Sequence, residues 1–381
     1  MTVTHPAGFV AVGLAVGLKS SGDPDLALVH NLGPSNAAAA VFTRNRAQAN
    51  PIIWSKQVIA DGRAAAIILN AGGANCYTGS AGFQVTHATA EAVASKLGCS
   101  TTDVLVCSTG LIGQQLPLEP ILRGIGHAVL SADGGADAAR AIMTTDSRPK
   151  TTIVEGNGWS IGGMAKGAGM LAPGLATMLV VITTDADLPA DALDQTLRAA
   201  TRVSFDRLDS DGCMSTNDQV TLMASGASGI RPDIADFTRA LVEACDDLAA
   251  QLQGDAEGSS HDITIETVHA ATEDDAVEVG RSVARNNLFK AAMFGNDANW
   301  GRVLAAIGTT TAEFDPYDVD VSMNGVMVCR SGEPGDSREL VDLSPRAVHV
   351  LIDLKVGAAT ASIRTNDLTH EYVHENSAYS S

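Results

Sequence analysis

The sequence predicts an α/β protein whose mixed sheets are covered by helices in layers. Hydrophobic residues make up 45% of the 381 residues and charged residues 18%, so the chain can bury a sizeable core. Short apolar runs alternate with helix-like segments and are bounded by Gly, Pro, Asn and Ser, a pattern typical of sheets packed against helices. Hairpin turns within this pattern indicate mixed or antiparallel sheets rather than purely parallel ones.

In the first part of the chain, apolar runs that predict strands alternate with segments that predict helices. The helical segment at residues 119–132 carries Pro120 in its first turn, where a proline is tolerated. The predicted strands are residues 25–32, 38–44, 64–70 and 103–109, and the predicted helices are residues 87–98, 119–132 and 135–146.

The middle of the chain predicts a hairpin followed by a buried strand. Residues 151–167 turn at Gly156-Asn157-Gly158, which favours a tight hairpin. Residues 177–185 form an apolar, β-branched run, which is typical of a strand buried on both faces.

The second half begins with the clearest helix, which Pro232 starts and which has apolar residues at helical spacing up to Leu252. Asn324-Gly325 is the strongest hairpin signal in the chain. The tail, residues 374–381, is polar, and such a tail is normally frayed. The other elements predicted here are a strand at residues 261–270, one helix at 273–295, a hairpin at 318–329 and a strand pair at 349–367.

The charge and the cysteines exclude several classes of protein. The 44 acidic and 25 basic residues give a net charge of −19, so neither nucleic acid nor an anionic membrane is expected as a partner. The apolar stretch at residues 9–18 lacks the charged region of a signal peptide and is a poor match to a membrane span. Six cysteines without a C-x-x-C pair predict reduced thiols in the cytoplasm and no zinc site.

One hydroxyl, that of Thr177, stands where a glycine-rich loop becomes an apolar strand in the stretch MAKGAGMLAPGLATMLVVITTDA. A phosphate-binding loop is excluded, because a Walker loop ends in its lysine and opens a helix, whereas here Lys166 comes first and a strand follows. Two alternatives stay open. Thr177 is an ordinary strand residue with a locally bonded hydroxyl. Otherwise the chain is cut after Ala176, and the new α-amine, with a pKa of ~7.7–8.0, activates the hydroxyl as a nucleophile.

Two further loops that contain glycine follow predicted strands. LNAGGANCYTG, at residues 69–79, either turns backbone N–H groups toward an anion or is a tight loop between sheet and helix. CSTGLIG, at residues 107–113, either presents the Thr109 hydroxyl and the Gly110 N–H to a developing oxyanion or is a plain turn. The residues alone favour the plain structural alternative for both loops.

KGAGMLAPGLATML also resembles the signature of the arginine-biosynthetic ornithine acetyltransferases, the bifunctional glutamate N-acetyltransferase family. GGANCYTG, CSTGLIG, IMTTD, DGCMSTND, DAEG, NWGRVLAA and ENSAYSS occur in the expected order, so the resemblance covers essentially the whole chain. It implies a four-layer αββα sandwich, shared with self-processing aminopeptidases. It also implies cleavage at Ala176-Thr177 into an α chain, residues 1–176, and a β chain, residues 177–381, which form one catalytic unit and pair into a heterotetramer.

The resemblance assigns site residues position by position. Thr177 matches the nucleophile, and Thr109 and Gly110 match the oxyanion pair. Gly174 stands where many members have Asn, and Ala168 where many have Ser, but the cleavage site itself is unchanged. The positions that match substrate-binding residues are Thr144, Lys166, Thr177, Glu257, Asn376 and Ser381.

The resemblance finally implies the reaction. Thr177 takes the acetyl group of N2-acetyl-L-ornithine, and L-glutamate then accepts it in a ping-pong second half, while Lys166 and Glu257 hold the charged ends of the amino acids. No metal or bound cofactor is implied, and acetyl-CoA is an alternative donor in bifunctional members. Two alternatives are an N-terminal-nucleophile aminopeptidase, which passes its acyl group to water, and an uncleaved binding protein.

Overall fold

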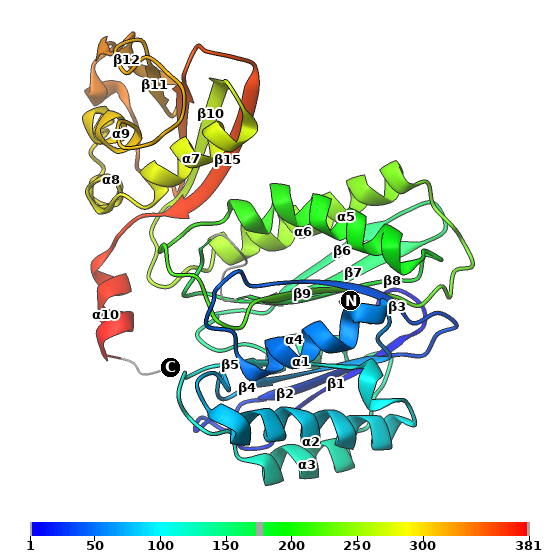
Figure 1. Cartoon of the computed structure of the whole chain (residues 1–381). Coiled ribbons are helices and arrows are strands. Elements are labelled where there is room, and N and C mark those ends of the chain that lie inside the picture. The colour runs from blue at the N-terminus through cyan, green and yellow to red at the C-terminus, as the bar shows by residue number, and fades with distance from the viewer. Residues whose placement is uncertain (1, 173–177, 379–381) are drawn as a thin grey trace.

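The computed structural model describes residues 2–172 and 178–378, so Ala176, Thr177 and Ser381 lie outside the described residues. Within these ranges the strands form three sheets of four, five and six strands, which we call sheets A, B and C. Sheets A and B lie face to face, and sheet C stands beside them with its own helices (Figure 1).

Sheets A and B are built largely from buried strands. Sheet A has the order β1 (Phe9–Leu14), β2 (Leu26–Asn31), β4 (Ala66–Ala71) and β5 (Val104–Thr109), and sheet B has the order β3 (Ala37–Phe42), β9 (Gln219–Ala224), β8 (Leu179–Thr184), β7 (Ser160–Lys166) and β6 (Lys150–Glu155). In β8, Leu179 and Val181 pack in the core shared with sheet A, whereas Val180 and Ile182 pack in the core on the opposite side. Burial on both faces explains the continuous apolar run that predicted this strand.

Helices cover the outer faces of both sheets. They are α1 (Asn50–Val58), α2 (Gly79–Leu97), α3 (Leu118–His127), α4 (Gly135–Ala141), α5 (Ala190–Val203) and α6 (Ile234–Gln253). α5 and α6 pack on sheet B, and α2 and α3 lie on the outer side of sheet A (Figure 1). α1 and α4 pack against the edge strands β5 and β1. The order is therefore helix, sheet, sheet, helix, and the predicted α/β fold class is confirmed.

Sheet C forms a C-terminal module with a core of its own. Its order is β13 (Glu333–Pro334), β12 (Val326–Arg330), β11 (Asp320–Met323), β14 (Ala347–Asp353), β10 (Asp262–Ala270) and β15 (Ala359–Asn366), and its helices are α7 (Glu273–Ala284), α8 (Asn287–Phe294) and α9 (Trp300–Ile307). The apolar side chains of the three helices and of one face of the sheet are buried together.

Two predictions for this module are wrong in detail. β14 and β15 occupy the predicted strand pair, but β10 lies between them and pairs parallel with β14 and antiparallel with β15. The single helix predicted at residues 273–295 is two helices, because the Asn286 side chain accepts the N–H of Phe289 at 3.0 Å and begins α8. The hairpin at Asn324-Gly325 is confirmed, with φ angles of 45° and 83°.

The polar end of the chain is helical up to residue 378. α10 (His370–Ala378) leaves sheet C and extends toward the sandwich (Figure 1). The Thr369 hydroxyl, just before this helix, donates to the Gly258 carbonyl at 2.6 Å. Within the tail, the Asn376 amide donates to the Glu257 carboxylate at 3.0 Å, so the described part of the tail is tied to the fold instead of frayed.

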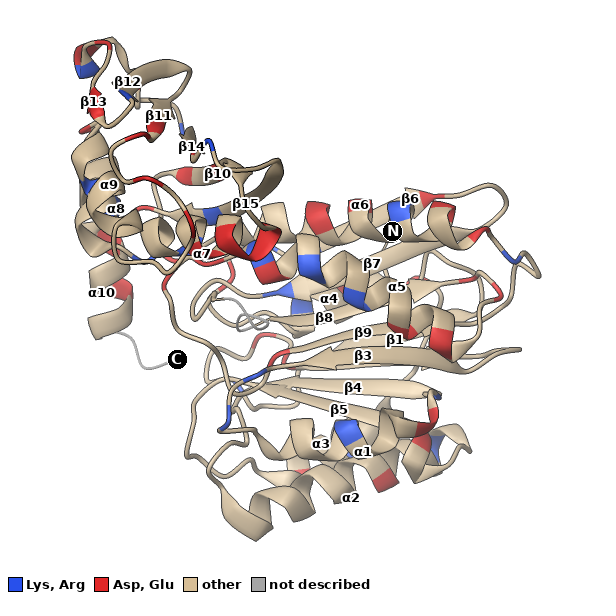
Figure 2. Ribbon diagram, turned by 45° about the horizontal axis from the view of Figure 1, so that its top comes forward, with Lys and Arg blue, Asp and Glu red and all other residues tan. Residues whose placement is uncertain are grey.

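The surface and the thiols agree with the composition. All six cysteines are free thiols. Acidic and basic residues are interspersed over the helices and loops of the molecule (Figure 2). In the part of the chain that the structure describes, no helix has both the length and the apolar sequence to cross a bilayer.

Candidate active site

A cavity of about 370 Å³ lies at the ends of β5 and β7, facing α10. It brings together the described residues that the family resemblance assigned to the site. These residues are Thr109, Gly110, Thr144, Lys166, Glu257 and Asn376. The cleavage pair Ala176-Thr177 and the tail residue Ser381, also assigned to the site, fall outside the described residues.

Thr109 and Lys166 meet at one wall of this cavity. Thr109 ends β5 and Lys166 ends β7, with exposed fractions of 2% and 1%. The Lys166 Nζ donates to the Thr109 Oγ1 at 3.3 Å. Because the threonine oxygen accepts this bond from an ammonium, its own hydroxyl hydrogen is left to donate to another group.

The two glycine-containing loops lie side by side at the same wall. Gly110 has a φ of 126°, and a Cβ there would lie 2.7 Å from the Gly73 nitrogen, so the position requires glycine. The N–H of Gly73 donates to the Thr109 carbonyl and that of Ala74 to the Leu111 carbonyl, both at 2.9 Å. These two N–H groups of GGANCYTG are thus used within the protein, which favours the tight-loop alternative for that motif.

A buried network of ionised side chains lies next to the cavity and holds its backbone in place. The Asp146 carboxylate accepts the backbone N–H of Thr144 at 2.9 Å and that of Gly167 at 2.6 Å. The Lys150 ammonium, 0% exposed, bridges Asp146 and Asp255 at 2.5 Å each. One carboxylate therefore fixes the backbone beside two of the assigned residues, Thr144 and Lys166.

Burial and neighbouring charges shift the pKa values of the ionisable groups here. Burial acts to raise the pKa of Asp146, but Lys166 and Lys150 outweigh it and hold that pKa below its ordinary value. Burial lowers the pKa of Lys166, opposed chiefly by Asp146 and then by Glu257 and Asp218. The site therefore combines the desolvated ammonium of Lys166 with the Asp146 carboxylate, which retains its charge.

Glu257 and Asn376 form the opposite wall. The Asn376 Nδ2 donates to the Glu257 Oε2 at 3.0 Å, which joins α10 to the loop after α6. A Cβ at Gly169 would lie 2.5 Å from the Glu257 Oε2, so this glycine of KGAG allows the carboxylate to approach. The resemblance placed the tail over the site, and Asn376 does lie at the cavity.

Sequence interpretation assigned no role to Asn217 or Asp218, although both belong to the quoted motif DGCMSTND. The Asn217 Nδ2 donates to the carbonyls of Ala74 at 2.6 Å and Ser108 at 2.8 Å, and so joins the two glycine loops. Asp218 is 0% exposed and accepts the N–H of Met178, the residue after Thr177, at 3.1 Å. Burial raises the pKa of Asp218 well above its usual range.

The layered fold and the gathering of Lys166, Glu257 and Thr109 in one cavity define a site suited to a small, charged molecule. The chain belongs to the ArgJ family, whose sequence model matches residues 10–381. It is 60% identical to the arginine biosynthesis bifunctional protein ArgJ of Streptomyces coelicolor and 57% identical to that of Thermobifida fusca, over 100% of each chain. It is also 52% identical to the solved ornithine acetyltransferase from Mycobacterium tuberculosis complexed with ornithine, over 47% of this chain and 96% of that chain, with a TM-score of 0.45.

Proposed function

We propose that this enzyme of arginine biosynthesis transfers the acetyl group of N2-acetyl-L-ornithine to L-glutamate and so forms L-ornithine and N-acetyl-L-glutamate. Membership of the ArgJ family along nearly the whole chain carries this proposal. The gathering of Thr109, Gly110, Lys166 and Glu257 in one cavity supports it, because these residues come from distant parts of the chain.

The nucleophile in this proposal is Thr177. Cleavage of the Ala176-Thr177 bond frees an α-amine that takes the hydroxyl proton as Thr177 attacks the acetyl carbonyl. The carbon–nitrogen bond of the donor breaks, ornithine leaves with that proton on its amine, and the acetyl group remains as a threonine ester. The α-amine of glutamate then attacks the ester and regenerates Thr177.

Thr109 and Gly110 stabilise the charge that develops on the carbonyl oxygen. The hydrogen bond from Lys166 to the Thr109 oxygen supports this role, because it orients the hydroxyl and strengthens it as a donor. Glu257 and Asn376 are suited to hold the charged ends of the amino acids, and Thr144 lies at the same cavity.

The proposal includes the processing and assembly of the chain. Residues 1–176 become the α chain and residues 177–381 the β chain, and two such pairs form a heterotetramer in the cytoplasm. The enzyme needs no bound cofactor, and acetyl-CoA serves as a second acetyl donor.

A transfer assay tests the activity. The purified enzyme is incubated with acetylornithine in the presence and absence of glutamate, and acetylglutamate, acetate and ornithine are quantified. An acetyltransferase forms acetylglutamate in proportion to ornithine when glutamate is present. An aminopeptidase-like hydrolase instead releases acetate at the same rate with or without glutamate, and an uncleaved binding protein forms no product. A parallel assay with acetyl-CoA in place of acetylornithine tests the second donor.

A further inference from the structure

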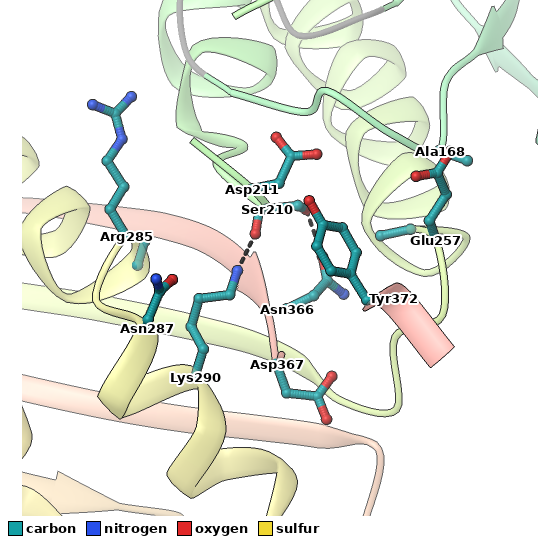
Figure 3. A pocket seen from close by; sticks show the side chains of 12 residues that line it. Ala168, Ser210, Asp211, Glu257, Arg285, Asn287, Lys290, Asn366, Asp367 and Tyr372 are labelled. Carbon is teal, nitrogen blue, oxygen red and sulfur yellow. Dashed lines mark hydrogen bonds between the residues drawn. The ribbon is translucent and has the colours of Figure 1, made fainter. Parts of the chain in front are cut away.

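A second cavity, of about 70 Å³, lies between the sandwich and the sheet C module (Figure 3). We call it the Lys290 cavity and define it by the residues that matter here, which are Ser210, Asp211, Glu257, Lys290, Asp367 and Tyr372. Figure 3 shows that these side chains come from the loops before β9 and after α6, from α8, from the end of β15 and from α10.

The Lys290 cavity adjoins the candidate active site. Glu257 lines both cavities. Ala168 lines the Lys290 cavity and its neighbour Gly169 lines the active site. On α10, Tyr372 and Asn376 are one helical turn apart and line the two cavities respectively. A ligand in the active site could therefore extend past Glu257 into the second cavity.

Lys290 and Arg285 are the cations that line this cavity, and Arg285 already forms an ion pair with Asp209 at 2.7 Å. The Lys290 side chain is 5% exposed, and its Nζ donates to the Ser210 carbonyl and, at 3.5 Å, to the Thr365 hydroxyl. Among the described residues no carboxylate forms an ion pair with Lys290. The carboxylate that raises its pKa most is Asp211. An ammonium has three donors and its burial is costly, so a carboxylate ligand that reaches the Lys290 Nζ would stabilise it further.

Carboxylates line the same cavity. Asp211 accepts the N–H of Cys213 at 3.1 Å, and Glu257 accepts the Asn376 amide at 3.0 Å. Each carboxylate has further lone pairs, so either can accept another donor. The cavity therefore offers partners for a carboxylate ligand and for an ammonium ligand within the same space.

The proposed ping-pong reaction needs both kinds of partner in one place. Ornithine carries an ammonium at the end of its side chain and glutamate carries a carboxylate, yet both must present their α-nitrogen to the same acetyl group. A subsite of a single charge would bind one side chain and repel the other.

We propose that the Lys290 cavity is the subsite for the side-chain ends of both amino acids. The Lys290 ammonium binds the side-chain carboxylate of glutamate, and Asp211 with Glu257 binds the side-chain ammonium of ornithine. This inference rests on the proposed function and adds the residues that select the acceptor.

The test is the choice of acceptor by Lys290→Met, which keeps the length of the side chain and removes its charge. Glutamine matches glutamate in shape but lacks the charge. Since a hydrogen bond between charged groups contributes about 1.5–3 kcal/mol, the preference in kcat/KM for glutamate over glutamine should fall by ~10–100-fold in the variant. A merely structural role would lower kcat/KM for both acceptors by the same factor and leave the preference unchanged, which would overturn the proposal.

Asp211→Asn gives the reciprocal test, because it removes only a charge. It should raise KM for acetylornithine, and an unchanged KM would contradict the assignment of Asp211. Lys355→Met is the matched control, since Lys355 pairs with Asp318 and Asp320 in sheet C and should keep wild-type values.

Folding and activity are checked separately. Chain masses and Tm establish that each variant is folded. If Lys290→Met does not fold, Lys290→Gln replaces it, because it also removes the charge and keeps a hydrogen-bond donor. Wild-type enzyme that forms no acetylglutamate would reject the proposed function, whereas active wild type with an unaltered preference in the variant would reject the subsite alone.

Discussion

At the residue scale, the hydroxyl of Thr109 is held by the Lys166 ammonium at the end of β5. If this hydroxyl stabilises the oxyanion, Thr109→Ala should lower kcat by roughly 10–1000-fold with a much smaller effect on KM. Thr109→Ser is the matched control, because it keeps the hydroxyl and should retain most of the activity. Steady-state kinetics with acetylornithine test this role. A wild-type kcat in the alanine variant would show that CSTGLIG is an ordinary turn.

The pKa of Lys290 makes a prediction for pH dependence. Burial lowers this pKa to about 8, while the charges of Asp211, Asp209 and Asp367 oppose the shift. Below that pH Lys290 is charged and binds a carboxylate, and above it the charge is lost. KM for glutamate should therefore rise as the pH passes about 8, whereas KM for glutamine should not follow it.

Measurement of KM for both acceptors from mildly acidic to alkaline pH tests this prediction. The α-amines of the two acceptors titrate alike, so the ratio of the two KM values isolates Lys290. A ratio that does not change with pH would contradict the role of its charge.

At the element scale, Lys150 holds together the carboxylates of Asp146 and Asp255 beneath the active site. Lys150→Met removes the cation that bridges these two carboxylates, which should lower the free energy of unfolding by about 3–5 kcal/mol. Urea denaturation of the uncleaved Thr177→Ala background measures the difference in one continuous chain. Arg198→Met, which removes an exposed ion pair with Asp194, should cost no more than about 1 kcal/mol, and an equal loss in both variants would contradict the account.

α10 carries the tail to the active site through Asn376. Deletion of residues 376–381 should leave self-cleavage intact and raise KM for acetylornithine. It should also increase acetate release relative to acetylglutamate, because water then reaches the acetyl ester more easily. Ser377→Ala is the control, since the Ser377 hydroxyl bonds only within the helix in the described structure. A truncated enzyme with wild-type KM and product ratio would make the tail dispensable.

Elements set by local sequence could be predicted, and those set by distant contacts could not. The hairpin at Asn324-Gly325 follows from a turn that both residues favour. The position of β10 between β14 and β15 depends on pairing over long chain separations, which no local pattern encodes. The helix break at Asn286 was missed because the apolar spacing continues across it, and only the capping contact ends the pattern.

The same division holds for the site. Thr109, Lys166 and Glu257 were found through motifs, because each motif keeps its residues together in the sequence. Lys290 was missed because its cavity is assembled from segments far apart in the chain, and a lysine within a helical pattern predicts only an exposed face. Its 5% exposure is the property that sequence alone does not reveal.

At the scale of the whole molecule, the two facing sheets supply the reactive wall and the sheet C module supplies the second cavity. The oxyanion candidates lie at the end of sheet A, and Lys166 lies at the end of sheet B. Glu257 and α10 connect this wall to the module. Catalysis and acceptor choice are therefore assigned to different parts of the fold that meet at Glu257.

The central claim is that Thr177 becomes the N-terminal nucleophile and carries the acetyl group. Intact mass spectrometry after incubation with acetylornithine, without glutamate, tests it most directly. The account predicts two chains, residues 1–176 and 177–381, with one acetyl group on the second chain that glutamate removes. Thr177→Ala should remain full-length and take up no acetyl group. A wild-type chain that stays uncut while it transfers acetyl, or an acetyl group on any residue other than Thr177, would contradict it.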